Sequence, residues 1–392
     1  MKKHICALLL AATISLQGYA QSADDWQTVK FTVAQAPEWT KLLNRGDGWF
    51  GADGIYTIPL NGQEGKPAGK NDKTLLIFSD TMIGTVRDNT LAPGSRMIHN
   101  SAAILKGNVP DEKAIQFYWD KNAKNEAEPL FVPTSPATKK GEYFWLGDGF
   151  VNKDQNNSLY IFGYRIFNVS EEAFGFREVG NTLIKLNAND VPKFTNQKQE
   201  DTPLYLLDNK GDIGSFGAGI YANTKSAGAP DADGYIYVYG VRGMAKQLVL
   251  ARVPAKSFDD FKQWRYWDGS NWQTDINSLV NITDKVSNEL SVTRLADGRF
   301  ALVFQVNGMS PFVGMRIGKS LTGPFGPIIK LWDCSKDLAK KSYTVYNAKA
   351  HPTLSKPGEL LISYNINSVE FLKDLQEYPN LYRPRFIRVK FE

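Results

Sequence analysis

Five short apolar segments recur along the chain, and a cluster of turn-forming residues precedes each of them. The segments are TLLIFSD (74–80), SLYIFGY (158–164), YIYVYGV (235–241), RFALVFQ (299–305) and ELLISYN (359–365). The preceding turn clusters are GKND, DQNN, DADG, ADG and KPG. Apolar, β-branched and aromatic runs bounded by Gly, Asn, Asp and Pro are typical of strands joined by tight turns. Their recurrence at intervals of roughly 60 to 85 residues predicts a fold built from repeated β-sheets.

Each repeat also contains a small-residue segment before the turn and two weaker strands after the strong strand, which makes four strands. The fifth repeat is one strand short. The alternating segment WQTVKFTVAQ (26–35) supplies a strand at the other end of the chain. We therefore expect an all-β, five-bladed β-propeller with four-stranded blades, whose last blade is closed by the N-terminal strand. Short helices are expected at 257–264 and 368–378. The alternative is a two-domain β-sandwich chain.

The first twenty residues match a secretory signal peptide. Lys2 and Lys3 form a positive region, an apolar region follows at 5–16, and Ala20 ends a small-residue cleavage site. The expected mature chain is a single propeller domain at 21–392, secreted or periplasmic. Cys6 within the signal leaves a surface lipoprotein as a less favoured interpretation. No later segment is long and apolar enough to predict a membrane span.

Composition and motifs exclude several classes of function. Loss of Lys2 and Lys3 lowers the net charge from +5 to +3, and no basic tract or finger spacing predicts nucleic-acid binding. The chain lacks a G-x-S-x-G elbow, a P-loop, an H-E-x-x-H motif and a dinucleotide fingerprint. Two mature histidines and one mature cysteine do not make a typical zinc site, so no metal site is predicted. Calcium in the central channel is compatible with carbonyl and acidic ligands, but no cofactor is required. The sequence does not indicate an oligomeric state.

Three acids fall on segments expected to line the propeller axis: Asp53, Asp148 and Glu289. Glycine and alanine around the first two suit a crowded axis, where larger side chains would collide. Glycoside hydrolases use pairs of carboxyl groups as their catalytic groups, and separate strands can bring such a pair together. One carboxyl group protonates the leaving oxygen, and the other activates water or attacks carbon. A third acid nearby raises the pKa of the proton donor. These three residues are the predicted catalytic set.

Each of these residues also has a structural interpretation. Asp53 and Asp148 precede glycines, and Asp-Gly is a common turn pair. Glu289 is equally consistent with a solvated acid at a loop end. His351, which precedes Pro352, is interpreted first as a hydrogen-bonded structural histidine and second as a tunable base.

Further residues at the ends of the strong strands are candidates for binding hydroxyl groups or stacking on a sugar ring. For every aromatic among them the competing interpretation is packing within a blade. The predicted substrate-binding residues are Trp49, Asp80, Arg96, His99, Trp145, Arg165, Phe216, Arg242, Gln305, His351 and Asn365.

The order of the three acids resembles that in five-bladed propeller glycoside hydrolases of the arabinanase and β-xylosidase type, family 43 and its relatives. GKSLTGPFGP (318–327) is similar to a segment those enzymes carry after a blade strand. HPTLSKPGELLISYN (351–365) resembles the last blade of a group of secreted Bacteroidetes propellers, relatives of which are linked to arabinan degradation. Asp53 is followed by Gly54 where family 43 usually has proline, and Glu289 lies one blade later than the usual acid.

The resemblance implies roles for the acids: Asp53 as base, Asp148 as pKa modulator and Glu289 as general acid. It also implies that His351 corresponds to a histidine near a channel calcium in arabinanases. The first hypothesis is therefore a secreted glycoside hydrolase acting on a carbohydrate such as an arabinan-like polysaccharide. The alternatives are a non-catalytic glycan-binding propeller of a polysaccharide utilisation system and a propeller that binds other proteins.

Overall fold

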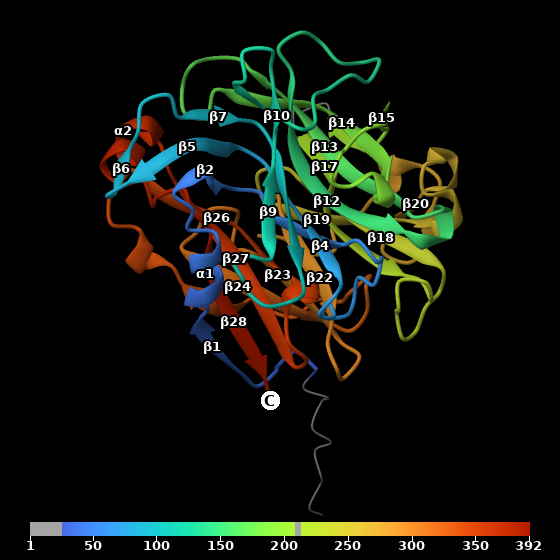
Figure 1. Ribbon diagram of the computed structural model, residues 1–392. Helices are drawn as coiled ribbons and strands as arrows, with labels where there is room; N and C mark the ends of the chain where they lie inside the picture. Colours follow the sequence, from blue (N-terminus) through green and yellow to red (C-terminus); the bar gives the residue numbers. More distant parts are fainter. Residues whose placement is uncertain (1–25, 208–212) are drawn as a thin grey trace, which may run out of the picture.

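The computed structural model describes residues 26–207 and 213–392, and the predicted signal peptide at 1–20 lies outside them. The described chain is all-β, and each of the five strong strands predicted from the sequence lies in a different antiparallel sheet (Figure 1). The first of these sheets has the order β3-β4-β8-β9, and the second has the order β12-β13-β14-β15. Their strands are β3 (Tyr56–Pro59), β4 (Lys73–Phe78), β8 (Ser101–Lys106), β9 (Ile115–Tyr118), β12 (Tyr143–Asn152), β13 (Ser158–Asn168), β14 (Phe176–Asn187) and β15 (Lys198–Asp201).

The third sheet has six strands in the order β16 to β21, and the fourth has four strands in the order β22 to β25. Their strands are β16 (Tyr205–Leu207), β17 (Ile213–Asn223), β18 (Tyr235–Arg242), β19 (Gln247–Pro254), β20 (Arg265–Trp267), β21 (Trp272–Gln273), β22 (Leu290–Arg294), β23 (Phe300–Gln305), β24 (Phe312–Gly318) and β25 (Ile329–Asp333). The segment 257–264, predicted as a short helix, contains short 3-10 turns.

The last sheet joins the two ends of the described chain. Its order is β26 (Tyr343–Ala350), β27 (Glu359–Ser368), β28 (Arg385–Phe391) and β1 (Phe31–Gln35). β1 pairs antiparallel with β28 from Phe31 opposite Phe391 to Gln35 opposite Ile387, and the two strands lie side by side near the C-terminus (Figure 1). The predicted pairing of an N-terminal strand with the last sheet is therefore confirmed, although the strand begins at Phe31. Helix α1 (Pro37–Leu42) follows β1, and α2 (Phe371–Glu377) lies within the helix predicted at 368–378.

Shorter strands form two further sheets. β2 (Asp47–Ala52) pairs with β5 (Thr81–Arg87), and β5 also pairs with β6 (Thr90–Leu91) and β7 (Arg96–Ile98). β10 (Asp120–Lys121) and β11 (Ala127–Glu128) form a separate hairpin. Apolar side chains of neighbouring sheets pack together in several buried clusters, so the core lies between the sheets.

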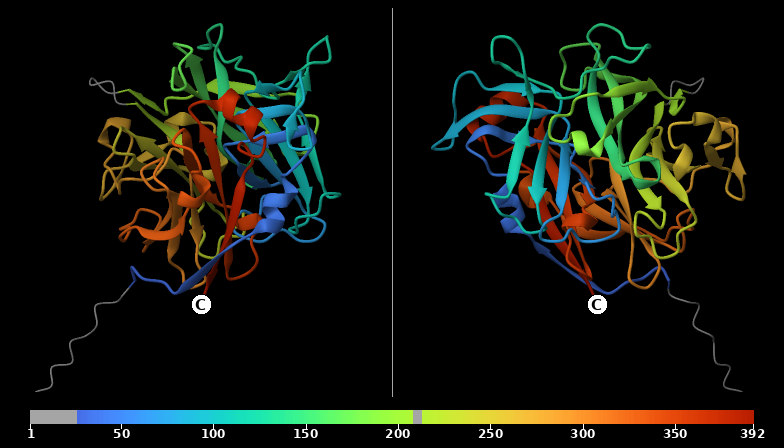
Figure 2. Two further views of the ribbon diagram at one scale, coloured as in Figure 1. Left: turned by 90° about the vertical axis from the view of Figure 1, so that its left-hand side faces the viewer. Right: turned by 45° about the vertical axis from the view of Figure 1, so that its right-hand side comes forward.

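The five sheets that hold the strong strands each supply one of the strands β3, β12, β17, β22 and β26, which contact one another in chain order, and we call them the ring strands. β26 returns to the β3 region through Tyr346, which binds Asp53, and His351, which lies against Thr57. Figure 2 shows the sheets side by side around the centre of the molecule, each turned relative to the next. Contacts of β26 with its neighbours advance in the same direction along both chains: Tyr346 meets Asp53 and His351 meets Thr57, while Lys349 meets Glu289 and Ala350 meets Ser291. The ring strands therefore run in one direction. Their N-terminal ends share one side of the ring and their C-terminal ends share the other.

Candidate active site

Asp53 lies at a break in a long two-stranded ribbon. β2 ends at Ala52 and β3 begins at Tyr56, while the partner strands β4 and β5 are separated by Ser79 and Asp80. The Asp53 amide donates to the Asp80 carbonyl at 3.1 Å, and the Ser79 amide donates to the Asp53 carbonyl at 2.9 Å. Gly54 has φ +61°, and an added Cβ would lie 2.6 Å from Ser79 Oγ, so the bend requires glycine. This break places the two acids side by side.

The Asp53 carboxyl group is buried but not isolated. Its residue is 9% exposed, and the Tyr346 hydroxyl donates to Oδ2 at 2.6 Å. Burial, and then the neighbouring Asp80, raise the pKa of Asp53 to about 7, although hydrogen bonds from Tyr346 and Tyr382 and the charge of Lys349 act in the opposite direction. At neutral pH this carboxyl group is therefore present in both protonated and ionised forms.

Lys349, which the sequence analysis missed, links the three predicted acids. Its side chain is 1% exposed, and its ammonium forms an ion pair with the Glu289 carboxylate and lies 3.9 Å from the centre of the Tyr56 ring. Burial lowers the pKa of Lys349 well below its ordinary value, although the charges of Asp148 and Asp53 act in the opposite direction. Asp53, Asp148 and Glu289 therefore come from three sheets to one buried lysine, whose positive charge compensates carboxylates that would be costly alone.

Asp148 lies in a β-bulge between Leu146 and Gly149 of β12. Its two carboxylate oxygens accept hydrogen bonds from the amides of Gly149 at 2.8 Å and Ile220 at 2.7 Å. Burial nevertheless raises the pKa of Asp148 to about 7. The contact with Ile220 connects β12 to β17, so Asp148 has a structural role whatever its chemical one.

Three of the predicted binding residues gather near Asp53. His99 Nδ1 lies 3.0 Å from Asp80 Oδ1, and the His99 ring stacks on Tyr143 with centroids 3.7 Å apart. Tyr143 in turn contacts Trp145 edge to face. The buried indole N–H of Trp145 has no hydrogen-bond partner among the described residues. These rings extend from Asp80 and form a partly exposed aromatic surface, which we call the aromatic rim.

Most of the other predicted binding residues belong to the framework. Arg165 pairs with Glu142 and Asp201, and Trp49 donates its indole N–H to Ser101. The framework residues are all hydrogen-bonded, ion-paired or packed within or between sheets: Trp49, Arg165, Phe216, Arg242, Gln305 and Asn365. Arg96 lies on an edge strand and forms a salt bridge of 3.5 Å with Glu126.

His351 has the environment of the structural histidine that was its first interpretation. It is 1% exposed, its Nδ1 lies 3.2 Å from Thr57 Oγ1, and its Nε2 lies 2.8 Å from Ser363 Oγ. Burial, and then Lys349, lower the pKa of His351 to about 3, so the ring is neutral at pH 7. With both nitrogens engaged by hydroxyl groups, this histidine does not fit the calcium-associated role that the resemblance implies. No cluster of three His, Cys, Asp or Glu side chains suited to a metal occurs within 26–207 and 213–392.

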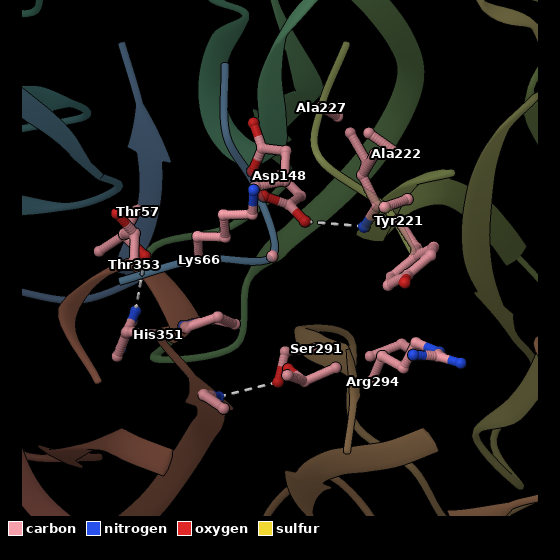
Figure 3. Close-up of a pocket in the computed structure, with 18 of the residues that line it drawn as sticks. Thr57, Lys66, Asp148, Tyr221, Ala222, Ala227, Ser291, Arg294, His351 and Thr353 are labelled. Carbon is pink, nitrogen blue, oxygen red and sulfur yellow. Dashed lines mark hydrogen bonds between the residues drawn. The ribbon is translucent and has the colours of Figure 1, made fainter. Parts of the chain in front are cut away.

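A cavity of about 380 Å³ lies at the C-terminal side of the ring strands (Figure 3). Asp148 and Lys349 line its inner part, and Glu64, which the sequence analysis also missed, lines it from the loop between β3 and β4. Burial, and then Asp148, raise the pKa of Glu64 well above its ordinary value. The region around Lys349 thus has two sides, one with Asp53 and Glu289 and one with this cavity.

A signal for Lys349 was present in the sequence. The bulges of three ring strands fall at LGDG (146–149), FGAG (216–219) and YNAK (346–349). Aligning these segments would have placed Lys349 at the position of Gly149 and Gly219. Glu64 has no comparable signal, because it lies in a loop outside the repeated pattern.

A family model covers nearly all of the described chain. It matches residues 37–391 and is called DUF5005, a domain of unknown function. The chain belongs to the DUF5005 family. No curated protein sequence matches it. None of the helices in the described part of this DUF5005 chain is long and apolar enough to cross a bilayer.

Solved structures similar to this DUF5005 chain include hydrolases. A crystal structure from Bacteroides ovatus, called a "putative hydrolase", superposes with a TM-score of 0.69 at 21% identity, covering 94% of this chain and 92% of that one. An exo-β-1,3-galactanase from Phanerochaete chrysosporium, solved with β-1,3-galactotriose, has a TM-score of 0.48 at 9% identity, covering 88% of this chain and 62% of that one. The first likeness shows a shared fold.

Proposed function

We propose that this chain is an exported glycoside hydrolase whose sheets form a five-bladed propeller, with Asp53 and Glu289 as its reacting carboxyl groups. The observation that carries the proposal is that their surroundings favour different protonation states. Burial and Asp80 raise the pKa of Asp53 to about 7, whereas the ion pair with Lys349 favours the ionised form of Glu289. Two carboxyl groups whose surroundings favour opposite protonation states are typical of a catalytic acid and its partner base or nucleophile.

The environments favour roles opposite to those implied by the family resemblance. Asp53 retains a proton near neutral pH and is the better proton donor for a leaving glycosidic oxygen. Glu289, whose carboxylate lies against Lys349, is the better base or nucleophile. Asp148 acts on this pair through Lys349, because its charge favours the ammonium form of that lysine.

The position of the two acids supports access by a substrate. Asp53 precedes β3 and Glu289 directly precedes β22, so both lie at the N-terminal end of the ring strands. The aromatic rim of His99, Tyr143 and Trp145 begins beside Asp80 at the same end. Aromatic rings beside polar groups suit the alternating apolar and hydroxylated faces of a sugar. We propose that the rim binds the sugar next to the bond that is cleaved.

The hydrolase named among the structural neighbours supports the reaction class, and the sequence resemblance makes an arabinan-like polysaccharide the first substrate to test. A non-catalytic glycan-binding protein is the second candidate. It is favoured by the fact that Tyr346 and Lys349 already engage the carboxyl groups of Asp53 and Glu289.

The test is the release of reducing sugar from a panel of plant and microbial polysaccharides by the mature protein. Asp53→Asn and Glu289→Gln should each reduce release by about 10²- to 10⁴-fold, the usual effect of removing a catalytic proton-transfer group. Asp297→Asn, a surface change, serves as the control and should leave release unchanged. Substantial release by both acid variants would refute the assignment. Binding to a polysaccharide without any release would favour the second candidate.

A further inference from the structure

The cavity at the C-terminal side of the ring strands is separate from the proposed reacting pair. Ile220, Tyr221 and Ala222 of β17, the whole of β22, and the turn after β26 line it, whereas neither Asp53 nor Glu289 does. Figure 3 shows Asp148, Tyr221, Ser291, Arg294 and His351 around one space. Its volume of about 380 Å³ falls within the range of small-molecule sites.

Two polar side chains in the cavity wall have buried atoms without partners. Thr293, only 9% exposed, has a buried hydroxyl that makes no hydrogen bond to a described residue. The same holds for Oε1 of Glu64. Buried polar groups are nearly always hydrogen-bonded, and leaving one unsatisfied costs about 1 to 3 kcal/mol. Both atoms therefore favour a ligand that brings hydrogen-bonding groups into this space.

The deeply buried charges of the cavity favour a neutral ligand, whereas Lys66 lines the cavity as an exposed cation. Lys349 is paired with Glu289, and Arg294 is paired with Asp231. Burial raises the pKa of Glu64 well above its ordinary value and that of Asp148 to about 7, so each carboxyl group keeps a larger protonated fraction near neutral pH than a free acid does. An anionic or cationic ligand would find no unpaired opposite charge among the deeply buried lining groups, whereas hydroxyl groups can donate to and accept from them.

The remaining wall is apolar. Leu290, Val292 and Leu295 line it together with Ile220, and the Tyr221 side chain lies nearby (Figure 3). A wall that is polar on one part and aliphatic or aromatic on another matches a sugar ring, whose hydroxyl edge is polar and whose C–H face is apolar.

We infer that this cavity is a second carbohydrate site, which binds a neutral mono- or disaccharide through Glu64, Thr293 and Asp148, apart from the reacting carboxyl groups. The inference does not depend on hydrolysis, because the cavity contains neither residue of the proposed reacting pair. A small sugar bound there would contact Lys349 and so lie against the other side of the cluster that contains Asp53 and Glu289.

The test uses the mature protein with Asp53→Asn, so that turnover does not consume the probe. Calorimetry or ligand-observed NMR would measure binding of D-galactose, L-arabinose, D-xylose, D-glucose and their disaccharides. At least one probe should bind saturably. Adding Thr293→Val, which keeps the side-chain shape but removes the hydroxyl, should weaken that binding about two- to tenfold, and Glu64→Gln should also weaken it.

Thr344→Val provides a matched control, because Thr344 is a half-buried strand residue outside the cavity. It should leave the dissociation constant unchanged. Absence of saturable binding for every probe at millimolar concentration, or equal affinity in the parent, Thr293→Val and Glu64→Gln proteins, would overturn the inference. If sugar binds here but no polysaccharide is cleaved, only the proposed function fails. If polysaccharide is cleaved but no probe binds, only this inference fails.

Discussion

The two ends of the ring strands hold buried acids in different ways. At the N-terminal end, Glu289 is paired with the Lys349 ammonium and Asp53 accepts a hydrogen bond from Tyr346. At the C-terminal end, Asp148 is held by backbone amides, and one carboxyl oxygen of Glu64 has no hydrogen-bond partner in the described part of the chain. The difference shows how one buried lysine can divide a set of acids. In our proposals, the carboxyl groups beside Lys349 react in opposite protonation states, and those on the other side hold a neutral ligand.

The largest expected effect comes from removing that cation. Lys349→Met leaves Glu289 buried without its partner, and breaking a buried ion pair usually costs about 3 to 5 kcal/mol. The free energy of unfolding, measured with urea at pH 7, should fall by that order. Lys349→Met combined with Glu289→Gln should recover part of the loss, because no uncompensated charge then remains at this pair.

Lys341→Met is the control, since Lys341 lies just before the same strand and is exposed. A change in stability no larger than the control's would show that Lys349 does not compensate the acids. The contrast between the two ends would then lose its electrostatic basis.

The pH dependence of hydrolysis tests the assignment at the N-terminal end. The proton donor must be protonated, and the pKa of Asp53 is raised to about 7, so kcat/KM should fall as pH rises through about 7. The fall should approach tenfold per pH unit well above the pKa and amount to about fiftyfold between pH 7 and pH 9. A rate that stays constant or increases over this interval would contradict the role of Asp53 as the donor.

The pH dependence of the free energy of unfolding provides a second measure of the pKa of Asp53. Folding raises the pKa of Asp53, so the unfolded chain ionises first, and this residue's contribution to stability decreases as pH rises from about 4 to about 7. The decrease is roughly 1.4 kcal/mol per pH unit at most. Asp53→Asn has no carboxyl group to ionise at this position, so it should gain stability relative to the unmodified protein between pH 5 and pH 7. A difference that does not change with pH would show that Asp53 ionises at its ordinary pKa.

The smallest expected effect concerns Tyr346. Its hydroxyl donates to Asp53 and favours the ionised carboxylate, so Tyr346→Phe should raise the pKa of Asp53 further. The alkaline limit of kcat/KM should move upward by about one pH unit or less. Tyr343→Phe, in the same strand, should leave that limit in place. A downward shift in Tyr346→Phe would contradict the hydrogen-bond geometry at Asp53.

Much of the fold was predictable because the strand pattern repeats. The five strong strands and the pairing of β1 with β28 depend on local apolar runs and turns, which a single sequence displays. The helix expected at 257–264 was wrong, since that segment contains only 3-10 turns. Its apolar spacing is too short to distinguish a helix from packed turns.

The site was less predictable than the fold. Asp53, Asp148 and Glu289 were predicted from their places in the repeat, and their catalytic role stays a prediction, whereas Phe216 and Trp49 are fully buried framework residues. An aromatic residue on a strand has the same sequence signature whether it faces a sheet or a ligand. Which of these occurs depends on the neighbouring sheet, and that sheet is distant along the chain.

By itself, the sequence determined the kind of elements, their repetition and the candidate acids, because each of these is a property of a few consecutive residues. Only the tertiary structure decided which acid meets the Lys349 ammonium and which faces the cavity with Glu64. The reason is geometric. The bulges of the ring strands shift the pairing register and thereby turn side chains from one side to the other, and a buried charge takes its state from whichever group this brings within a few ångströms.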